Sequence, residues 1–170
     1  MSRTKLLALI LVLAASLYSC SGKDGATGPR GNDGNANVVI FEYPTRTTTT
    51  GTFTYLFNAS QGLVDSSLVL AYCNPSSEAP TAWYPVPGLG SGGAYMTRSF
   101  WWQTTANPSQ YTYTVRLLTP SGSTTYTNST TFTKFKIILA PASEIIPLTA
   151  RGILDLSDYD AVREHLGLSE

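Results

Sequence analysis

Few side chains in this sequence are of the types that perform chemistry. The 170 residues include two cysteines, Cys20 and Cys73, and one histidine, His165. Cys20 ends an apolar N-terminal run and offers a nucleophilic thiol, whereas we expect Cys73, after an apolar segment, to be a small buried residue. His165 stands near the end of an expected helix, where it interacts with the last carbonyls. Because these residues lack metal-ligand or triad spacing, we expect no metal, no cofactor and no catalytic residue.

Carboxylates are the remaining candidates for catalysis. Glu42, Asp65 and Glu78 are the only acidic residues between positions 37 and 141. Glycoside hydrolases use a pair of carboxyl groups that flank the scissile bond. An envelope glycoside hydrolase, or another hydrolase, is therefore the alternative to a non-catalytic protein. We favour the non-catalytic interpretation because acidic residues at strand ends and in turns are mostly just hydrated.

Aromatic residues are better candidates for a binding site. Trp83, Tyr84, Trp101 and Trp102 offer flat faces on which sugar rings or partner side chains stack. Successive strand residues point to opposite faces, so we expect at least one of Trp101 and Trp102 in the core, and only one of them can serve a surface site. The interpretation that we favour over a binding role is that both fill the core and a neighbouring loop, because buried tryptophan is common in sandwiches.

The N-terminus has the pattern of a secretory signal. Arg3 and Lys5 precede an apolar run over residues 6–17, which is too short to span a bilayer that requires about 20 residues. The run ends in Leu17-Tyr18-Ser19-Cys20, which resembles the lipobox of bacterial lipoproteins, although Tyr18 is bulkier than the commonest residue there. This resemblance implies cleavage after residue 19 and lipidation of Cys20. The alternative is an ordinary cleaved signal that leaves a free thiol.

Glycine recurs at every third position over residues 22–34, in the register of collagen. About five triplets give a triple helix little cooperative length, so we expect residues 20–36 to be a polar tether and the protein to be a monomer, with a trimerising stalk as the alternative. This order of segments, together with the ending Leu156-Ser157-Asp158-Tyr159, resembles small collagen-like lipoproteins of Gram-negative envelopes. Ser21, rather than Asp, after Cys20 resembles an outer-membrane sorting signal, so we expect an outer-membrane lipoprotein that faces the periplasm or the cell surface.

Composition limits the partners of the remaining chain. The formal net charge is +0, and charged residues make up 13% of the sequence. Without a basic patch the chain lacks the electrostatic footprint of a nucleic-acid-binding protein. The membrane, through the lipid, and a glycan or protein are the partners that we expect.

Short alternating runs of aromatic and β-branched residues predict strands. They indicate an all-β fold for residues 37–141, an antiparallel β-sandwich of about seven or eight strands, Ig-like or jelly-roll-like. The expected strands cover residues 38–43, 52–57, 67–73, 82–84, 95–103, 110–118, 124–127 and 132–139.

The tail, residues 142–170, changes its pattern. We expect an irregular arm over residues 142–156, which carries Ile145, Ile146, Ile153 and Leu154 across a sheet edge. A short helix follows, with Ser157 as its N-cap, Gly167 as its C-cap, and Val162 and Leu166 packed against the sandwich. The sequence as a whole predicts a lipid-anchored, non-catalytic structural or binding module of the cell envelope.

Overall fold

Strand β8 (Gln110–Leu118) shows how alternation in the sequence builds the fold. In the computed structural model, which describes residues 37–168, its odd-numbered residues Tyr111, Tyr113, Val115 and Leu117 are all buried. Its neighbour β3 (Thr52–Asn58) buries Phe53, Tyr55 and Phe57 and exposes the residues between them. Burial in β3 thus has period two, as expected for a sheet with one face in a core, whereas in β8 the outer-face residues Thr112 and Thr114 are buried as well.

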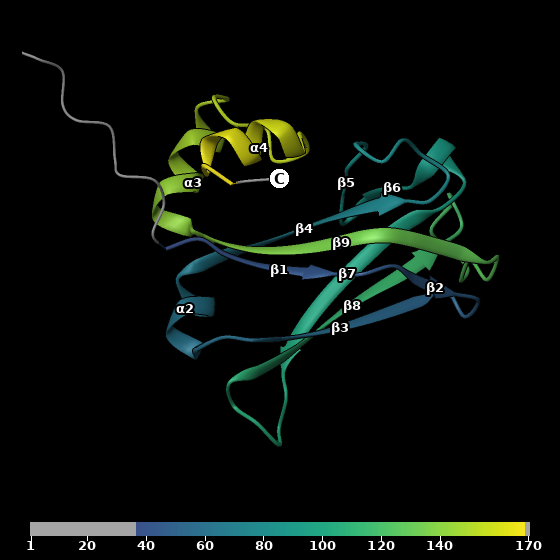
Figure 1. Ribbon diagram of the computed structural model, residues 1–170, viewed down its shortest axis with the longest axis horizontal. Coiled ribbons are helices and arrows are strands. Elements are labelled where there is room, and N and C mark those ends of the chain that lie inside the picture. Colours follow the sequence, from purple (N-terminus) through teal and green to yellow (C-terminus); the bar gives the residue numbers. More distant parts are fainter. Residues whose placement is uncertain (1–36, 169–170) are drawn as a thin grey trace, which may run out of the picture. The chain divides into compact units, whose positions relative to one another are not determined.

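Two antiparallel sheets form the sandwich (Figure 1). Sheet A contains five strands, and sheet B contains four. The order in sheet A is β1 (Val39–Tyr43), β9 (Thr130–Pro141), β4 (Ser67–Pro75) and β5 (Tyr84–Pro85), and β2 (Arg46–Thr48) also pairs with β9. The order in sheet B is β3, β8, β7 (Met96–Gln103) and β6 (Gly88–Leu89). The predicted β-sandwich is confirmed.

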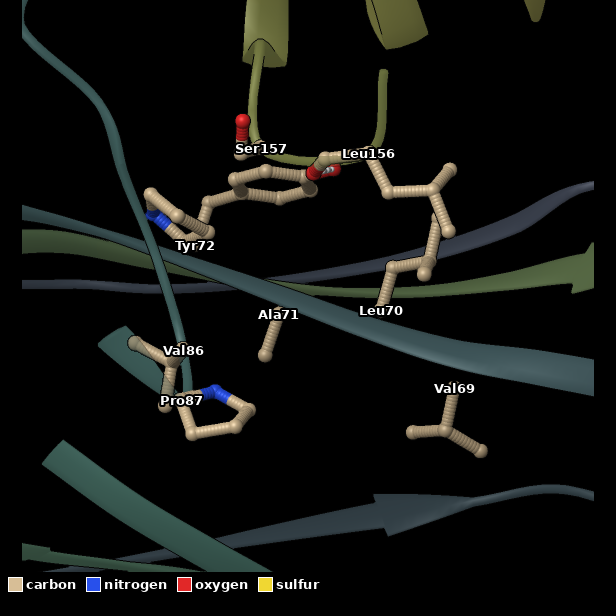
Figure 2. Close-up of a pocket in the computed structure, with 9 residues that line it drawn as sticks. Val69, Leu70, Ala71, Tyr72, Val86, Pro87, Leu156 and Ser157 are labelled. Atoms are coloured by element: carbon tan, nitrogen blue, oxygen red, sulfur yellow. Dashed lines mark hydrogen bonds between the residues drawn. The ribbon is translucent and has the colours of Figure 1, made fainter. Parts of the chain in front are cut away.

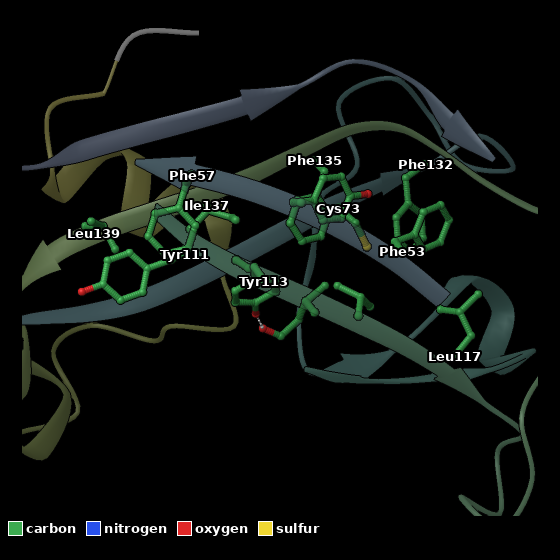
Figure 3. Packing of buried hydrophobic residues seen from close by; sticks show 14 of the residues in the cluster. Phe53, Phe57, Cys73, Tyr111, Tyr113, Leu117, Phe132, Phe135, Ile137 and Leu139 are labelled. Atoms are coloured by element: carbon green, nitrogen blue, oxygen red, sulfur yellow. Dashed lines mark hydrogen bonds between the residues drawn. The ribbon is translucent and has the colours of Figure 1, made fainter. Parts of the chain in front are cut away.

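Aromatic side chains from both sheets fill the space between them (Figure 3). The Phe135 ring of β9 stacks on the Tyr55 ring of β3, with centroids 4.0 Å apart and an interplanar angle of 4°. Phe132 stacks on Phe53 in the same way, at 4.4 Å. Such contacts add to the free energy gained by burying large apolar surfaces.

A second hydrophobic cluster covers the outer face of sheet A. Helices α3 (Ala142–Ala150) and α4 (Tyr159–His165) lie over this face (Figure 1). Val162 and Leu166 of the C-terminal segment pack there with Ile138 of β9 and Tyr72 of β4, which confirms the predicted docking of the last helix. Gly167, with φ +63°, ends α4, and the N–H of Leu168 donates to the Arg163 carbonyl at 3.0 Å. This is the expected left-handed C-cap.

The C-terminal region departs from the sequence analysis in two respects. The prediction of an irregular arm over residues 142–156 was wrong for the first part of this range, because helix α3 occupies Ala142–Ala150. Complete burial of Ile145 against sheet A stabilises this helix despite Pro147 within it. The N-cap of α4 is Asp158, not Ser157: the Asp158 carboxylate accepts from the N–H groups of Asp160 and Ala161. Leu154 is buried as well, whereas Ile146 and Ile153 are exposed.

Several short elements were not predicted. They are β2, β6, helix α2 (Gln61–Asp65) and the 3₁₀ turn η2 (Ser91–Gly93). The predicted strand over residues 124–127 is reduced to a single bridge between Leu118 and Thr125. The predicted signal peptide (1–19), Cys20 and the tether (20–36) lie outside the described residues. Among residues 37–168, no helix combines the length and the apolar character needed to cross a bilayer.

Gly51, in the turn between β2 and β3, gives a stability prediction. Its φ is +71°, and a Cβ atom would lie 2.5 Å from the Tyr126 carbonyl oxygen. Gly51→Ala should therefore lower the free energy of unfolding by about 2 kcal/mol or more. Gly62→Ala is the matched control, because Gly62 lies in α2 with open space around it, and alanine should stabilise that helix by up to about 1 kcal/mol. Urea unfolding of the chain from Asn37 measures both, and equal midpoints for the two variants would contradict the prediction.

Candidate ligand-binding site

Trp101 and Trp102 are both at the surface, which differs from the expectation that at least one fills the core. Trp101 is 41% exposed and Trp102 is 46% exposed. The two side chains do point to opposite faces of β7, as alternation requires. Trp101 points to the inner side, where its ring meets the Tyr111 ring edge-on at 5.8 Å. Strand β6 pairs only with Met96 and Thr97, so Trp101 lies on a part of β7 that has β8 as its one strand partner among the described residues.

Trp102 belongs to a group on the outer face of sheet B, which we call the aromatic row: Phe100, Trp102 and Leu56. The Phe100 and Trp102 rings stack, with centroids 5.6 Å apart. Thr112 of β8 stands opposite Trp102 and also opposite Leu56 of β3, so one cross-strand line runs Trp102, Thr112, Leu56. All three members of the aromatic row are exposed. Exposed apolar groups that cluster in this way mark interaction surfaces.

Two arginines continue the aromatic row along the same face. Arg98 and Arg116 are directly opposite each other on β7 and β8, and both are exposed. The Arg116 guanidinium lies 5.1 Å from the centroid of the Phe100 ring, within the range of a cation–π contact. A ligand on this face therefore meets an apolar ring surface beside the hydrogen-bond donors of two arginines.

Of the other two predicted stacking residues, Tyr84 belongs to β5 of sheet A and Trp83 lies in the loop just before it. Trp83 contacts the cluster beneath α4, with its ring centroid 4.8 Å from that of Tyr159. Tyr84 pairs with Cys73 through β5 and packs against the core between the sheets. The structure thus separates the four predicted residues: Trp102 is in the aromatic row, Trp101 is on the inner side of β7, and Trp83 and Tyr84 lie at the other sheet.

Trp83 lines a cavity of about 530 Å³, together with residues that the sequence analysis did not single out. Lys134 and Lys136 of β9 and Tyr159, Asp160 and Arg163 of α4 form its walls, and Pro80 and Thr81 complete it. We call this cavity the basic pocket. The sequence offered one signal for it: lysines at alternate positions of a strand that is otherwise apolar.

The candidate catalytic acids occupy separate elements. Glu42, on β1, forms an ion pair with Lys136 at 2.9 Å. Glu78 accepts a hydrogen bond from the Ser91 hydroxyl, and Asp65 is the last residue of α2. His165 is the last residue of α4. Glu42 and Glu78 thus have partners in their own surroundings, and the structure does not bring the four residues together.

Cys73 is a free, buried thiol, as predicted. It lies between the sheets among Phe135, Phe53 and their neighbours (Figure 3). Burial raises the pKa of the Cys73 thiol to about 12. Since the thiolate is the reactive form, Cys73 behaves as a hydrophobic core residue at neutral pH.

A smaller cavity of about 280 Å³ lies beside β4, near the point where β5 ends (Figure 2). Its walls are mainly apolar and include Val69, Ala71 and the Val86–Pro87 segment. The Tyr72 hydroxyl donates to the Leu156 carbonyl at 2.8 Å and ties the segment before α4 to the sheet. The residues that line this cavity carry no charge, so it has little means to orient a polar ligand.

The fold and these surfaces define the protein as a two-sheet antiparallel β-sandwich with C-terminal helices and an exposed aromatic row. No protein-family model matches the chain, and comparisons with curated proteins and with solved structures find no similar protein.

Proposed function

We propose that this protein is a lipid-anchored, non-catalytic binding module of the bacterial cell envelope, which holds a glycan against the outer face of sheet B. The exposed aromatic row is the observation that carries the binding role. Ring faces of Phe100 and Trp102 suit the apolar C–H faces of sugars. The exposed Arg98 and Arg116 suit sugar hydroxyl groups, which need hydrogen-bond partners.

The anchored location rests on the sequence. The basic start, the short apolar run and Leu17-Tyr18-Ser19-Cys20 support lipidation at Cys20, and the glycine-rich residues 22–36 support a polar spacer in front of the sandwich. An outer-membrane position is the proposal that the resemblance to envelope lipoproteins favours. The protein acts as a monomer in this proposal.

A glycan array, followed by calorimetry with the best glycan, tests the binding role in the chain from Asn37, which contains all elements of the sandwich. Trp102→Ala should weaken binding by about 1.4 kcal/mol or more, a factor of about ten. Trp101→Ala is the matched control, because Trp101 points to the other side of β7 and should leave the affinity unchanged. Equal losses in the two variants would refute the site. A chain that binds no glycan on the array but retains an envelope protein in a pull-down would refute the ligand class.

A further inference from the structure

The basic pocket lies at the place where the outer face of sheet A emerges from beneath α4. Lys134 and Lys136 point outward from β9, on the same side as Ile138, which the helices cover. Arg163 faces them from α4, and Trp83 closes the pocket from the loop that follows β4. Three cationic side chains from two elements therefore converge on one cavity of about 530 Å³.

Lys136 is the deepest of these cations, because its residue is only 5% exposed. Its Nζ donates to the Tyr159 hydroxyl at 2.7 Å and lies 2.9 Å from Glu42 Oε1. Burial acts to lower the pKa of Lys136, but the hydrogen bonds to Tyr159 and Glu42 outweigh burial and raise it. Lys136 therefore stays an ammonium ion with three donors, of which the described residues engage two.

The pocket has more positive than negative charge. Asp160 lies 3.6 Å from Arg163, but its side chain is 78% exposed, so this pair contributes little. Lys134 has no carboxylate within 4.0 Å among residues 37–168. An anionic group in the pocket would thus meet Lys134, which has no carboxylate partner in the described part of the chain, and the third donor of Lys136.

The walls beside these cations are aromatic and are held in place. Lys136 Nζ lies 4.8 Å from the Trp83 ring centroid, and the Trp83 ring contacts that of Tyr159. The loop before Trp83 is fixed by Asn74, which is buried and donates from Nδ2 to the carbonyls of Ala79 and Ala82 at 2.9 and 2.6 Å. A wall fixed in this way costs little ordering free energy when a ligand binds.

We infer that the basic pocket binds an acidic sugar, whose carboxylate meets Lys134 and Lys136 and whose ring packs against Trp83. The volume is within the range of sites for small organic ligands. Inorganic phosphate would satisfy the cations but leave the aromatic wall unused, whereas a neutral sugar would use the wall and leave the cations unpaired. An acidic sugar pairs with the cations and also packs against the aromatic wall. This site is separate from the aromatic row, so the two can be tested independently.

Calorimetry on the full, detergent-solubilised chain tests the inference with three probes at constant ionic strength: a disaccharide that contains glucuronic acid, its glucose counterpart and sodium phosphate. The acidic disaccharide should bind at least about tenfold more tightly than either other probe. Equal affinity for the two sugars, or tighter binding of phosphate, would overturn the inference.

Variants locate the binding. Lys134→Gln and Arg163→Gln remove exposed or half-buried charges and leave the contacts of Lys136 with Tyr159 and Glu42 intact. Each substitution should weaken binding of the acidic disaccharide by about fivefold to tenfold. Arg151→Gln, an exposed position at the end of α3, is the charge-matched control and should have no effect. Trp102→Ala should also leave this affinity unchanged. A similar loss in Arg151→Gln would reveal non-specific attraction and would refute the site.

Discussion

Cys20→Ser should abolish the attachment of fatty chains to the protein. In the proposed pathway the Cys20 sulfur is the atom that receives the lipid, and serine offers no thiol for that reaction. Two or more acyl chains give stable membrane attachment, whereas one alone is marginal. Cells fed an alkyne-tagged fatty acid should label the native protein and should not label the variant.

The second cysteine is the matched control for this experiment. Cys73→Ala should retain the full label, because Cys73 is 1% exposed within the core and its thiol does not meet the modifying enzymes. Mass spectrometry of the purified native protein gives the decisive measurement. An unmodified sulfur on Cys20 would refute the anchor, and with it the role proposed for residues 22–36 as a spacer.

Phe135→Ala should cost most of the stability of the sandwich. Phe135 is fully buried, and its ring contacts Tyr55, Tyr113 and Phe132 from both sheets. Removal of a buried phenylalanine ring costs about 3–5 kcal/mol, against a total of about 5–15 kcal/mol for an ordinary domain. Urea unfolding followed by tryptophan fluorescence should show a large drop in the midpoint.

Phe100→Ala is the control for this substitution, since it removes the same ring from the outer face of sheet B, where Phe100 is 37% exposed. It should cost about 1 kcal/mol or less. The two variants together separate the core from the aromatic row. A Phe135→Ala chain as stable as Phe100→Ala would mean that the sheets do not pack through this ring.

Strands in which several large apolar residues alternate with other residues were predictable. Strands of two or three residues, which are defined only by their pairing with a neighbour, were not. The bounds of β8 match the predicted residues 110–118, because four of its alternate residues are large and apolar. Strand β2 has three residues and β6 has two, too few for any period to show. Helix α3 was missed for another reason: its helical form depends on the contact of Ile145 with sheet A, which local sequence does not encode.

The candidate sites were likewise predictable only in the part that depends on local alternation. Alternation correctly placed Trp101 and Trp102 on opposite faces, but the exposure of Trp101 depends on how far the opposite sheet extends over it, which alternation does not reveal. Trp83 was recognised as a candidate, but its partners Lys134, Tyr159 and Arg163 come from β9 and α4. Only the docking of α4 onto sheet A brings them together.

The place of β9 within sheet A bears on how the protein is made. Strands β1 and β4 do not pair with each other, since each pairs with β9, which is encoded late in the chain. If the chain is exported from its N-terminus, as proposed, sheet A cannot be completed until Pro141 has crossed the membrane. Pairing of β9 with β1 and β4 would then be a late step of folding, because it joins segments far apart in the sequence.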